Sequence, residues 1–295
     1  MTDHSEDRVF EQARPALLGL AYRILGSRAD AEDAVQDTFL KWQRAERDTI
    51  ANPRAWLTTA CTRRAIDMLR AAHRSRVDYV GAWLPEPIET SIIVDAGDEG
   101  PLAASLNTAF MLMLERLTPK ERAAYLLHEI FEFDYPQIAQ TLDIQEAACR
   151  KLVSRARAHV DKAQVRHVTP VDQQEKLLAA FETAITSGDA TPFAALLSDD
   201  VALSADGGGK VPAVLRTLHG KTEVLTFIAS VSERFWRQQQ RTVADLNGTR
   251  SLIFRDGADI TTAVSFAYDA QGRVTNIFAM RNPDKLARLD EARVK

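Results

Sequence analysis

The chain has 295 residues and is 45% hydrophobic, which is enough for two or three compact domains with separate cores. No apolar run approaches the length of a bilayer span, and residues 1–15 lack an apolar secretory core, so we expect a cytoplasmic protein without a membrane partner. Cys61 and Cys149 have no CxxC or histidine-rich surroundings. They are expected to be small buried residues, and we expect no metal and no cofactor.

The net charge of -4 argues against DNA binding, but the charges are clustered. Residues 54–76 contain six arginines and one acid, and residues 150–166 contain six lysines or arginines and one acid. Residues 77–114 contain acids but no lysine or arginine. The sequence therefore predicts two basic helices separated by an acidic connection.

Residues 1–76 are predicted to form an all-helical unit. A first helix ends at Gly26, a second opens near Asp30, and a long third helix begins at Asn52 and Pro53. The second helix carries an acidic face, for which we expect a basic protein partner; carboxylates at a helix start are also favoured by the helix dipole alone. Its polar positions are Asp30, Glu32, Asp33, Gln36 and Asp37.

The third helix carries a basic face, which is either a solvated surface or a nucleic-acid contact. Trp42, the polar loop 43–52 and Trp56 lie beside it in the sequence. Aromatic side chains next to clustered arginines are typical of proteins that hold unstacked bases of single-stranded DNA. This pattern favours a part in DNA opening.

Residues 77–104 contain six glycines and prolines and are predicted to form a linker. Trp83 and Leu84 lie within it, and an exposed tryptophan is unusual in a free linker. We therefore expect the segment VGAWLPEP to dock on another part of the chain.

Residues 105–166 are predicted to contain a helix-turn-helix. Thr118 to Glu121 and Asp134 to Gln137 are helix-start signals, and a turn at Asp143 to Gln145 leads into a basic helix from Glu146 to Val160. We expect an inward stripe of Ala148, Leu152, Ala156 and Val160. The positions left for DNA are Gln145, Glu146, Arg150, Lys151, Ser154, Arg155 and Arg157.

Residues 171–295 are predicted to form an α+β domain with a mostly antiparallel sheet. Strands are expected at 201–204, 242–246, 251–255, 261–268 and 274–280, and helices at 173–186, 192–197 and 221–231. Asp206 and His219 are the nearby carboxylate and histidine that an enzyme would need as acid and base. The run from Gly207 to Gly209 fits either a tight turn or a cradle for an anion.

The segments AYRILGSRADAEDAVQDTFLKW, NPRAWLTTACTRRAIDMLR and LTPKERAAYLLHEIFEFDYPQIAQTLDIQEAACRKLVSRARAHV resemble regions 2 and 4 of the extracytoplasmic-function (ECF, group 4) factors of the sigma-70 family. The remainder is similar to the SnoaL-like (NTF2-like) extension of one subgroup, through VGAWLPEP, DGGGKV and NPDKL. The resemblance implies two all-α sigma domains followed by a cone-shaped α+β domain. Asp143 and Gln145 depart from the family pattern, which has Gly and a Ser cap there.

By this resemblance, the acidic helix contacts the clamp coiled coil of core RNA polymerase, and promoter DNA is the second partner. The -10 element contacts Trp42, Gln43, Asn52, Trp56, Arg63, Arg64 and Arg70, and the basic helix of region 4 contacts the -35 element. Interdomain regulatory contacts are expected at Trp83, Leu84, Pro85, Asp206, Gly207, Gly208, Gly209, Lys210, Asn282, Pro283, Asp284 and Lys285.

The sequence thus predicts a sigma factor, and not an enzyme, that directs polymerase to promoters, assists melting of the -10 element and is modulated by its own C-terminal domain. A small-molecule ligand in the C-terminal pocket is a candidate partner. Two alternatives stay open: a ligand-sensing DNA-binding regulator, and a DNA-binding module fused to a SnoaL-like isomerase or cyclase. The first of these leaves the acidic helix and region 2 unexplained.

Overall fold

The computed structural model describes residues 3–75, 79–94, 101–161 and 169–291. The predicted domain boundaries near residues 76 and 166 lie outside these ranges. The chain forms two compact units, one from the described residues of 1–77, 91–98 and 111–163, the other from those of 78–90, 99–110 and 164–295. Among the described residues no helix is long and apolar enough to cross a membrane.

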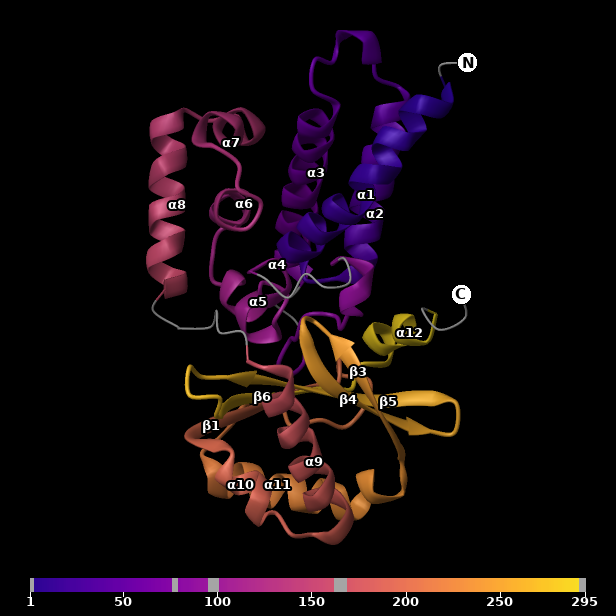
Figure 1. The fold of residues 1–295 in the computed structure, drawn as a ribbon, viewed down its shortest axis with the longest axis vertical. Coiled ribbons are helices and arrows are strands. Elements are labelled where there is room, and N and C mark those ends of the chain that lie inside the picture. The colour runs from indigo at the N-terminus through magenta and orange to yellow at the C-terminus, as the bar shows by residue number, and fades with distance from the viewer. Residues whose placement is uncertain (1–2, 76–78, 95–100, 162–168, 292–295) are drawn as a thin grey trace. The chain divides into compact units, whose positions relative to one another are not determined.

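The first unit is entirely helical, as predicted, and its long N-terminal helices α1, α2 and α3 pack on one another (Figure 1). Gly26 has a φ of 70° and ends the first helix, and Ser27 caps the second by accepting from the N–H of Asp30. Each of the three helices places apolar residues in the buried core, among them Leu20 of the first, Val35 of the second and Leu57 of the third. The elements of this part are α1 (Asp3–Leu25), α2 (Arg28–Gln43), η1 (Arg47–Thr49) and α3 (Pro53–Ser75); the short helix η3 (Thr90–Ile92) begins at the last residue of 78–90.

The predicted helix-turn-helix is also present. Thr118 and Asp134 both form capping boxes, and Asp143 ends its helix with a left-handed φ of 51°, a conformation that Asp tolerates. The predicted inward stripe is displaced by one position in its first half: Ala148 is exposed and Leu152 is half-buried, whereas Cys149, Val153, Ala156 and Val160 are buried. The helices of this part are α6 (Pro119–Glu129), α7 (Tyr135–Leu142) and α8 (Glu146–Asp161); before them in the chain, α4 (Pro101–Ala104) belongs to the second unit and α5 (Thr108–Leu114) begins in it.

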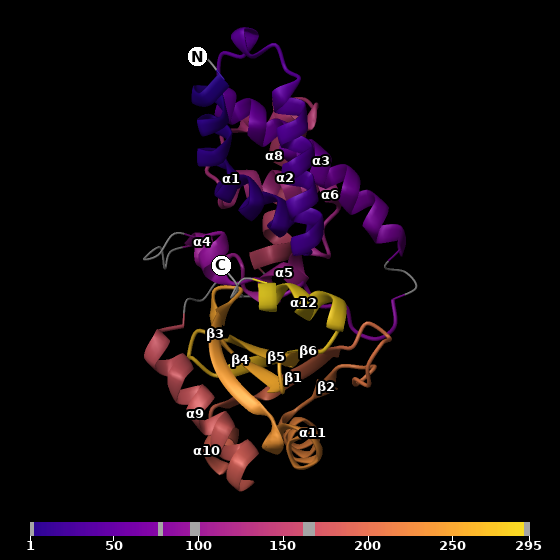
Figure 2. The same cartoon turned by 90° about the vertical axis from the view of Figure 1, so that its right-hand side faces the viewer.

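The second unit contains a six-stranded sheet in the order β2-β1-β6-β5-β4-β3, with β1 and β6 parallel and the other pairs antiparallel. Helices α9, α10 and α11 lie on one face and α12 on the other (Figures 1 and 2). The strands are β1 (Leu197–Asp206), β2 (Leu218–His219), β3 (Gln240–Leu246), β4 (Thr249–Asp256), β5 (Asp259–Tyr268) and β6 (Val274–Met280). The helices are α9 (Val171–Ser187), α10 (Thr191–Ala195), α11 (Lys221–Arg234), η4 (Trp236–Gln238) and α12 (Pro283–Glu291).

Aromatic side chains fill the space between the sheet and helices α9 to α11. The ring of Phe181 lies 5.0 Å from that of Phe193 and 5.4 Å from that of Phe266, and Trp236 stacks on Phe254 at 4.7 Å. All five side chains are at most 3% exposed. The predicted α+β class is confirmed, and the interior of this domain is a packed core.

Candidate functional site

The acidic face of α2 is partly neutralised by neighbouring arginines. Glu32 pairs with Arg28 at 2.9 Å, and Asp37 pairs with Arg64 of α3 at 2.6 Å. Asp30 lies in the first turn, where its backbone N–H is capped by Ser27. Asp33 and Gln36 are exposed, and of the predicted set they present the most accessible polar groups to a partner.

The residues predicted to hold single-stranded DNA are not equally accessible. Trp42 is 2% exposed, and its ring packs 5.5 Å from that of Trp56, so the expectation that it contacts DNA is corrected: it is a core residue. Trp56 is partly exposed and Gln43 is exposed. Asn52 caps α3, since its Oδ1 accepts from the N–H of Ala55 at 3.1 Å.

Arg63, also predicted to contact DNA, donates within its own unit to the C-terminal end of α7. Its Nε donates to the carbonyl of Thr141 at 2.8 Å and its Nη2 to that of Gln140 at 2.9 Å. The hydroxyls of Thr59 and Thr141 lie 3.0 Å apart beside this contact. A guanidinium is favoured at a helix C-terminus, where carbonyl groups lack partners in the helix. Those N–H groups cannot bind a phosphate while they bind the carbonyls.

A second contact with the helix-turn-helix part comes from α1 and involves a buried arginine. Arg122 is fully buried, donates from Nε to the carbonyl of Arg23 at 2.9 Å and pairs with Glu115. The Arg23 guanidinium lies 5.7 Å from the ring centroid of Phe131, and burial lowers the pKa of Arg23 to about 9. Neither arginine was among the predicted site residues, because only their burial and long-range partners distinguish them.

The basic helix α8 presents a mixture of paired and exposed side chains. Arg150 pairs with Glu146 and lies 4.2 Å over the ring of Tyr135, and Arg155 pairs with Glu121 at 3.2 Å. The pair of Arg150 with Glu146 is exposed and contributes little to stability, whereas the Glu121 side chain is only 13% exposed. Arg157 pairs with Glu129, whereas Gln145, Lys151 and Ser154 are exposed.

In the second unit, the linker is bound to the C-terminal domain through Asp206, which is fully buried. Oδ1 of this carboxylate accepts from the hydroxyl of Tyr79 at 2.6 Å and from the N–H of Gly208 at 2.9 Å. Oδ2 accepts from the N–H of Leu84 at 2.9 Å and from Nζ of Lys285 at 2.8 Å. We call these five residues the Asp206 clasp. Its carboxylate binds two positions of the linker at once.

Lys285 completes the clasp from α12. Its Nζ also donates to the carbonyl of Leu84 at 2.6 Å, and it lies 4.5 Å over the ring of Trp83 and 5.1 Å over that of Tyr79. Two linker aromatic rings thus surround one ammonium group, which is a favourable cation–π arrangement for a partly desolvated cation. The docking of VGAWLPEP that the sequence predicted is observed here.

The glycine run forms a tight turn that approaches α12. Gly208 has a φ of 62°, and a Cβ there would lie 2.3 Å from Nδ2 of Asn282; a Cβ on Gly207 would lie 2.4 Å from the carbonyl of Val211. Gly209 also has a positive φ. Asn282, which precedes Pro283 at the start of α12, donates to the hydroxyl of Tyr79 at 3.0 Å, and Lys210 pairs with Asp284 at the surface.

Comparison with known proteins follows the same division of the chain. The model of Sigma-70 region 2 matches residues 9–75, and that of Sigma-70 region 4 matches residues 107–160. The ECF RNA polymerase sigma factor SigJ of Mycobacterium tuberculosis is 36% identical over 294 residues, which cover 94% of this chain and 91% of SigJ. The chain belongs to the ECF RNA polymerase sigma factors.

The solved structure of SigJ and one further relative agree with this membership. The crystal structure of Mycobacterium tuberculosis SigJ matches with a TM-score of 0.73 at 32% identity and covers 96% of this chain and 98% of that one. The probable ECF sigma factor SigI of the same species is 34% identical over 195 residues, covering 65% of this chain and 67% of SigI. The resemblance predicted from the sequence is therefore confirmed, extension included.

In this sigma factor, the carboxylate and the histidine considered for catalysis bind different partners. Asp206 accepts hydrogen bonds from four donors. His219 is exposed on β2, and its backbone N–H donates to the carboxylate of Glu223. A cavity of about 20 Å³, with room for roughly one water molecule, lies where the linker covers the sheet. Its lining includes Leu84, Pro85, Pro87, Phe278 and Met280.

The sequence prediction of this sigma factor missed a further contact with the linker, at the turn between β3 and β4. Asn247 and Gly248 form that turn with φ values of 53° and 71°. Asn247 is 3% exposed and binds residues on both sides of segment 91–98. The Asn-Gly pair between two strand-like runs is a strong hairpin signal that was available in the sequence.

Proposed function

We propose that this sigma factor brings core RNA polymerase to promoters with a -10 and a -35 element, helps to melt the -10 element, and works in the cytoplasm, where the polymerase is. Region 2 would meet the clamp coiled coil through Asp30, Glu32, Asp33, Gln36 and Asp37, and region 4 would approach the flap. The -10 contacts would come from Gln43, Asn52, Trp56, Arg63, Arg64 and Arg70. Gln145, Glu146, Arg150, Lys151, Ser154, Arg155 and Arg157 would contact the -35 element.

The second part of the proposal is that the C-terminal domain modulates promoter output through the linker. The observation that carries it is the Asp206 clasp, in which one buried carboxylate binds Tyr79 and Leu84 of the linker and Lys285 of α12. A surface pair would contribute little, but a buried charge that loses a partner costs several kcal/mol. The linker is therefore strongly held along the segment that connects the two DNA-binding regions.

We also propose that the C-terminal domain acts without catalytic turnover. Both oxygens of Asp206 are occupied by donors, which disfavours its use as a general base, and aromatic side chains fill the interior that a substrate would need. A small-molecule ligand of this domain stays a prediction. The cavity under the linker has room for about one water molecule, so this cavity does not support it.

Run-off transcription with purified core polymerase tests the proposal. Full-length protein should start RNA at its promoters, which a ligand-sensing repressor cannot do. Asp33→Lys should weaken binding to core, since it reverses an exposed charge. Asp206→Asn should change RNA output while binding to core persists. RNA synthesis no greater than with core alone would refute the sigma activity, and unchanged output from Asp206→Asn would refute the modulation.

A further inference from the structure

The Asn247-Gly248 turn binds the linker at a place separate from the Asp206 clasp. Oδ1 of Asn247 accepts from the N–H of Ile88 at 3.1 Å, and its own N–H donates to the carbonyl of Ile88 at 2.9 Å. Its Nδ2 donates to the carbonyl of Leu106 at 3.3 Å. One side chain therefore binds the chain both before and after segment 91–98, at Ile88 and Leu106, whereas that segment belongs to the other unit.

Turn geometry alone does not explain this arrangement. Asn-Gly is favoured in a two-residue hairpin because both positions need a positive φ, but the side chain of such a turn ordinarily faces water. Here Asn247 is 3% exposed and both ends of its amide are bonded outside the hairpin. A Cβ on Gly248 would lie 2.4 Å from the carbonyl oxygen of Ala103, so the linker backbone also approaches the turn closely.

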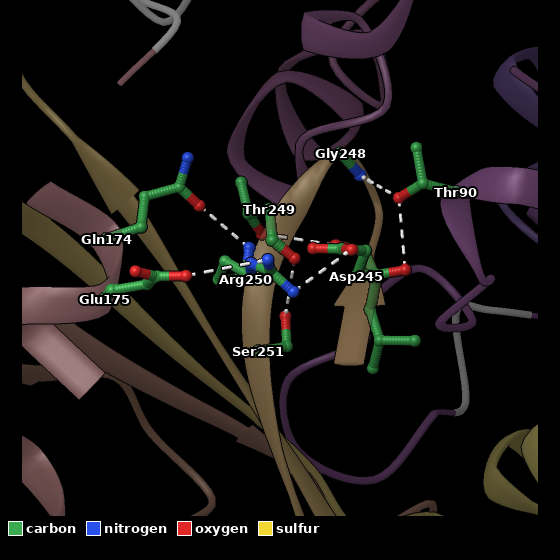
Figure 3. Close-up of polar contacts among 9 residues, drawn as sticks. Thr90, Gln174, Glu175, Asp245, Gly248, Thr249, Arg250 and Ser251 are labelled. Carbon is green, nitrogen blue, oxygen red and sulfur yellow. Dashed lines mark hydrogen bonds and ion pairs between the residues drawn. The ribbon is translucent and has the colours of Figure 1, made fainter. Parts of the chain in front are cut away.

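The turn is braced on both sides (Figure 3). The N–H of Gly248 donates to Oγ1 of Thr90 at 2.9 Å, and that hydroxyl donates to the carbonyl of Asp245 at 3.1 Å. On the side of the C-terminal domain, the N–H of Arg250 donates to Oε1 of Gln174 at 2.8 Å, and its guanidinium pairs with Asp245 at 3.3 Å. The turn is thus fixed to helix α9 of the domain and to the linker.

The consequence concerns the length of the connection. Between the end of α3 and Leu106 the chain has about 30 residues, which could span roughly 100 Å when extended. Because Ile88 and Leu106 bind the same side chain, residues 89–105 drop out of the path, which shortens to at most about 12 residues, or roughly 40 Å, and the Asp206 clasp holds Tyr79 and Leu84 within it. A shorter tether restricts the separations at which two DNA-binding regions can engage together.

We infer that Asn247 is a positioning residue: by tying Ile88 and Leu106 to one turn, it narrows the range of spacings between the -10 and -35 elements that this factor accepts. The inference rests on the proposed sigma function and deepens it. It assigns the choice of promoter spacing to a hairpin of the C-terminal domain, apart from the Asp206 clasp and its glycine turn.

The experiment is transcription by core polymerase with full-length protein on promoters whose spacer is varied in single base pairs around the optimum. The readout is the ratio of RNA from shifted spacers to RNA from the optimal spacer, which is independent of the active fraction of each variant. Asn247→Asp keeps the turn and the acceptor for Ile88 but places an oxygen against the carbonyl of Leu106. Asn247→Gly also keeps the positive φ and removes both side-chain bonds.

A matched pair of glycine variants controls for backbone strain. Gly248→Ala and Gly257→Ala both place an alanine at a positive φ, but a Cβ on Gly257 would have no atom within 4 Å, whereas that on Gly248 meets the linker. We expect the ratio to rise at least about fivefold in Asn247→Asp, Asn247→Gly and Gly248→Ala, because one net hydrogen bond is worth about that factor, and to stay at the wild-type value in Gly257→Ala.

Two results separate the possible failures. If wild-type protein transcribes but the ratio is the same in the two Asn247 variants and in Gly248→Ala as in Gly257→Ala, the inference is overturned and the turn has a purely structural role. If wild-type protein starts RNA on no spacer above core alone, the sigma function itself fails, and the inference falls with it.

Discussion

Asp206→Asn should destabilise the second unit far more than a similar change at the surface. Asp206 is fully buried and accepts from four donors, and its partner Lys285 has a side chain only 13% exposed. The asparagine retains one acceptor oxygen but turns an amide toward donors and leaves the ammonium without its counter-charge. Breaking a buried pair in this way costs about 3 to 5 kcal/mol.

Asp284→Asn is the matched control. Asp284 pairs with Lys210, but the two side chains are 64% and 53% exposed, so the loss should be at most about 1 kcal/mol. Thermal unfolding of the full chain should then show the transition of the second unit lowered by roughly 6 to 20 °C in Asp206→Asn and by less than about 4 °C in Asp284→Asn. Addition of Lys285→Met to Asp206→Asn should restore part of the loss, because no uncompensated charge remains buried.

Equal melting of the two asparagine variants would refute the reasoning. It would mean that the buried carboxylate contributes no more than an exposed one. A further loss on adding Lys285→Met would be equally damaging, since it would show that Lys285 stabilises the unit independently of Asp206.

Three further outcomes are expected. A disulfide between Thr59→Cys and Thr141→Cys, whose hydroxyls lie 3.0 Å apart, should abolish promoter melting until it is reduced, because it fixes Arg63 on the carbonyls of α7; each single variant is the control, and full melting by the oxidised protein would contradict this. Burial and the hydrogen bond to Asp206 raise the pKa of Tyr79, so above about pH 10 the phenol loses its proton in the unfolded state before it does in the folded state. Chemical unfolding should then show that wild-type protein loses stability relative to Tyr79→Phe as the pH rises above about 10. Parallel curves of stability against pH for the two proteins would count against this. Burial raises the pKa of the Cys61 thiol to about 12 and also raises that of Cys149, so both should react with a thiol reagent at pH 8 only after unfolding, and reaction in the native state would show that either is accessible.

Local sequence signals predicted the local structure well. The capping boxes at Thr118 and Asp134, the glycine stop at Gly26 and the left-handed Asp143 all depend on residues within one or two helical turns. The five predicted strands are present for the same reason, because the apolar pattern that predicts a strand lies within the strand itself. Ala148 was placed inward because adjacent small residues on a helix are hard to distinguish by periodicity.

What the sequence could not predict depends on distant partners. Arg63 looks like any surface arginine, yet it binds carbonyls 77 and 78 positions away. Trp42 lies beside the basic helix in sequence, but its ring turns into the core. The docking of the linker was expected from its tryptophan, but its partners Asp206 and Lys285 came only from the family resemblance, because these two residues are 79 positions apart.

The division of the linker between the two units has a consequence for how this extension can be removed. Segments 78–90 and 99–110 belong with the C-terminal domain, whereas 91–98 belongs with the helical unit. Deleting everything after region 4 would strip the cover from Leu84, Ile88 and Leu106, which are at most 3% exposed in the intact chain. Such a fragment would expose apolar linker residues between intact DNA-binding helices. Inactivity of the fragment would therefore report a damaged linker and not the loss of an activating domain. The extension shares its core with the linker, so only point changes can separate its influence on transcription from its part in folding.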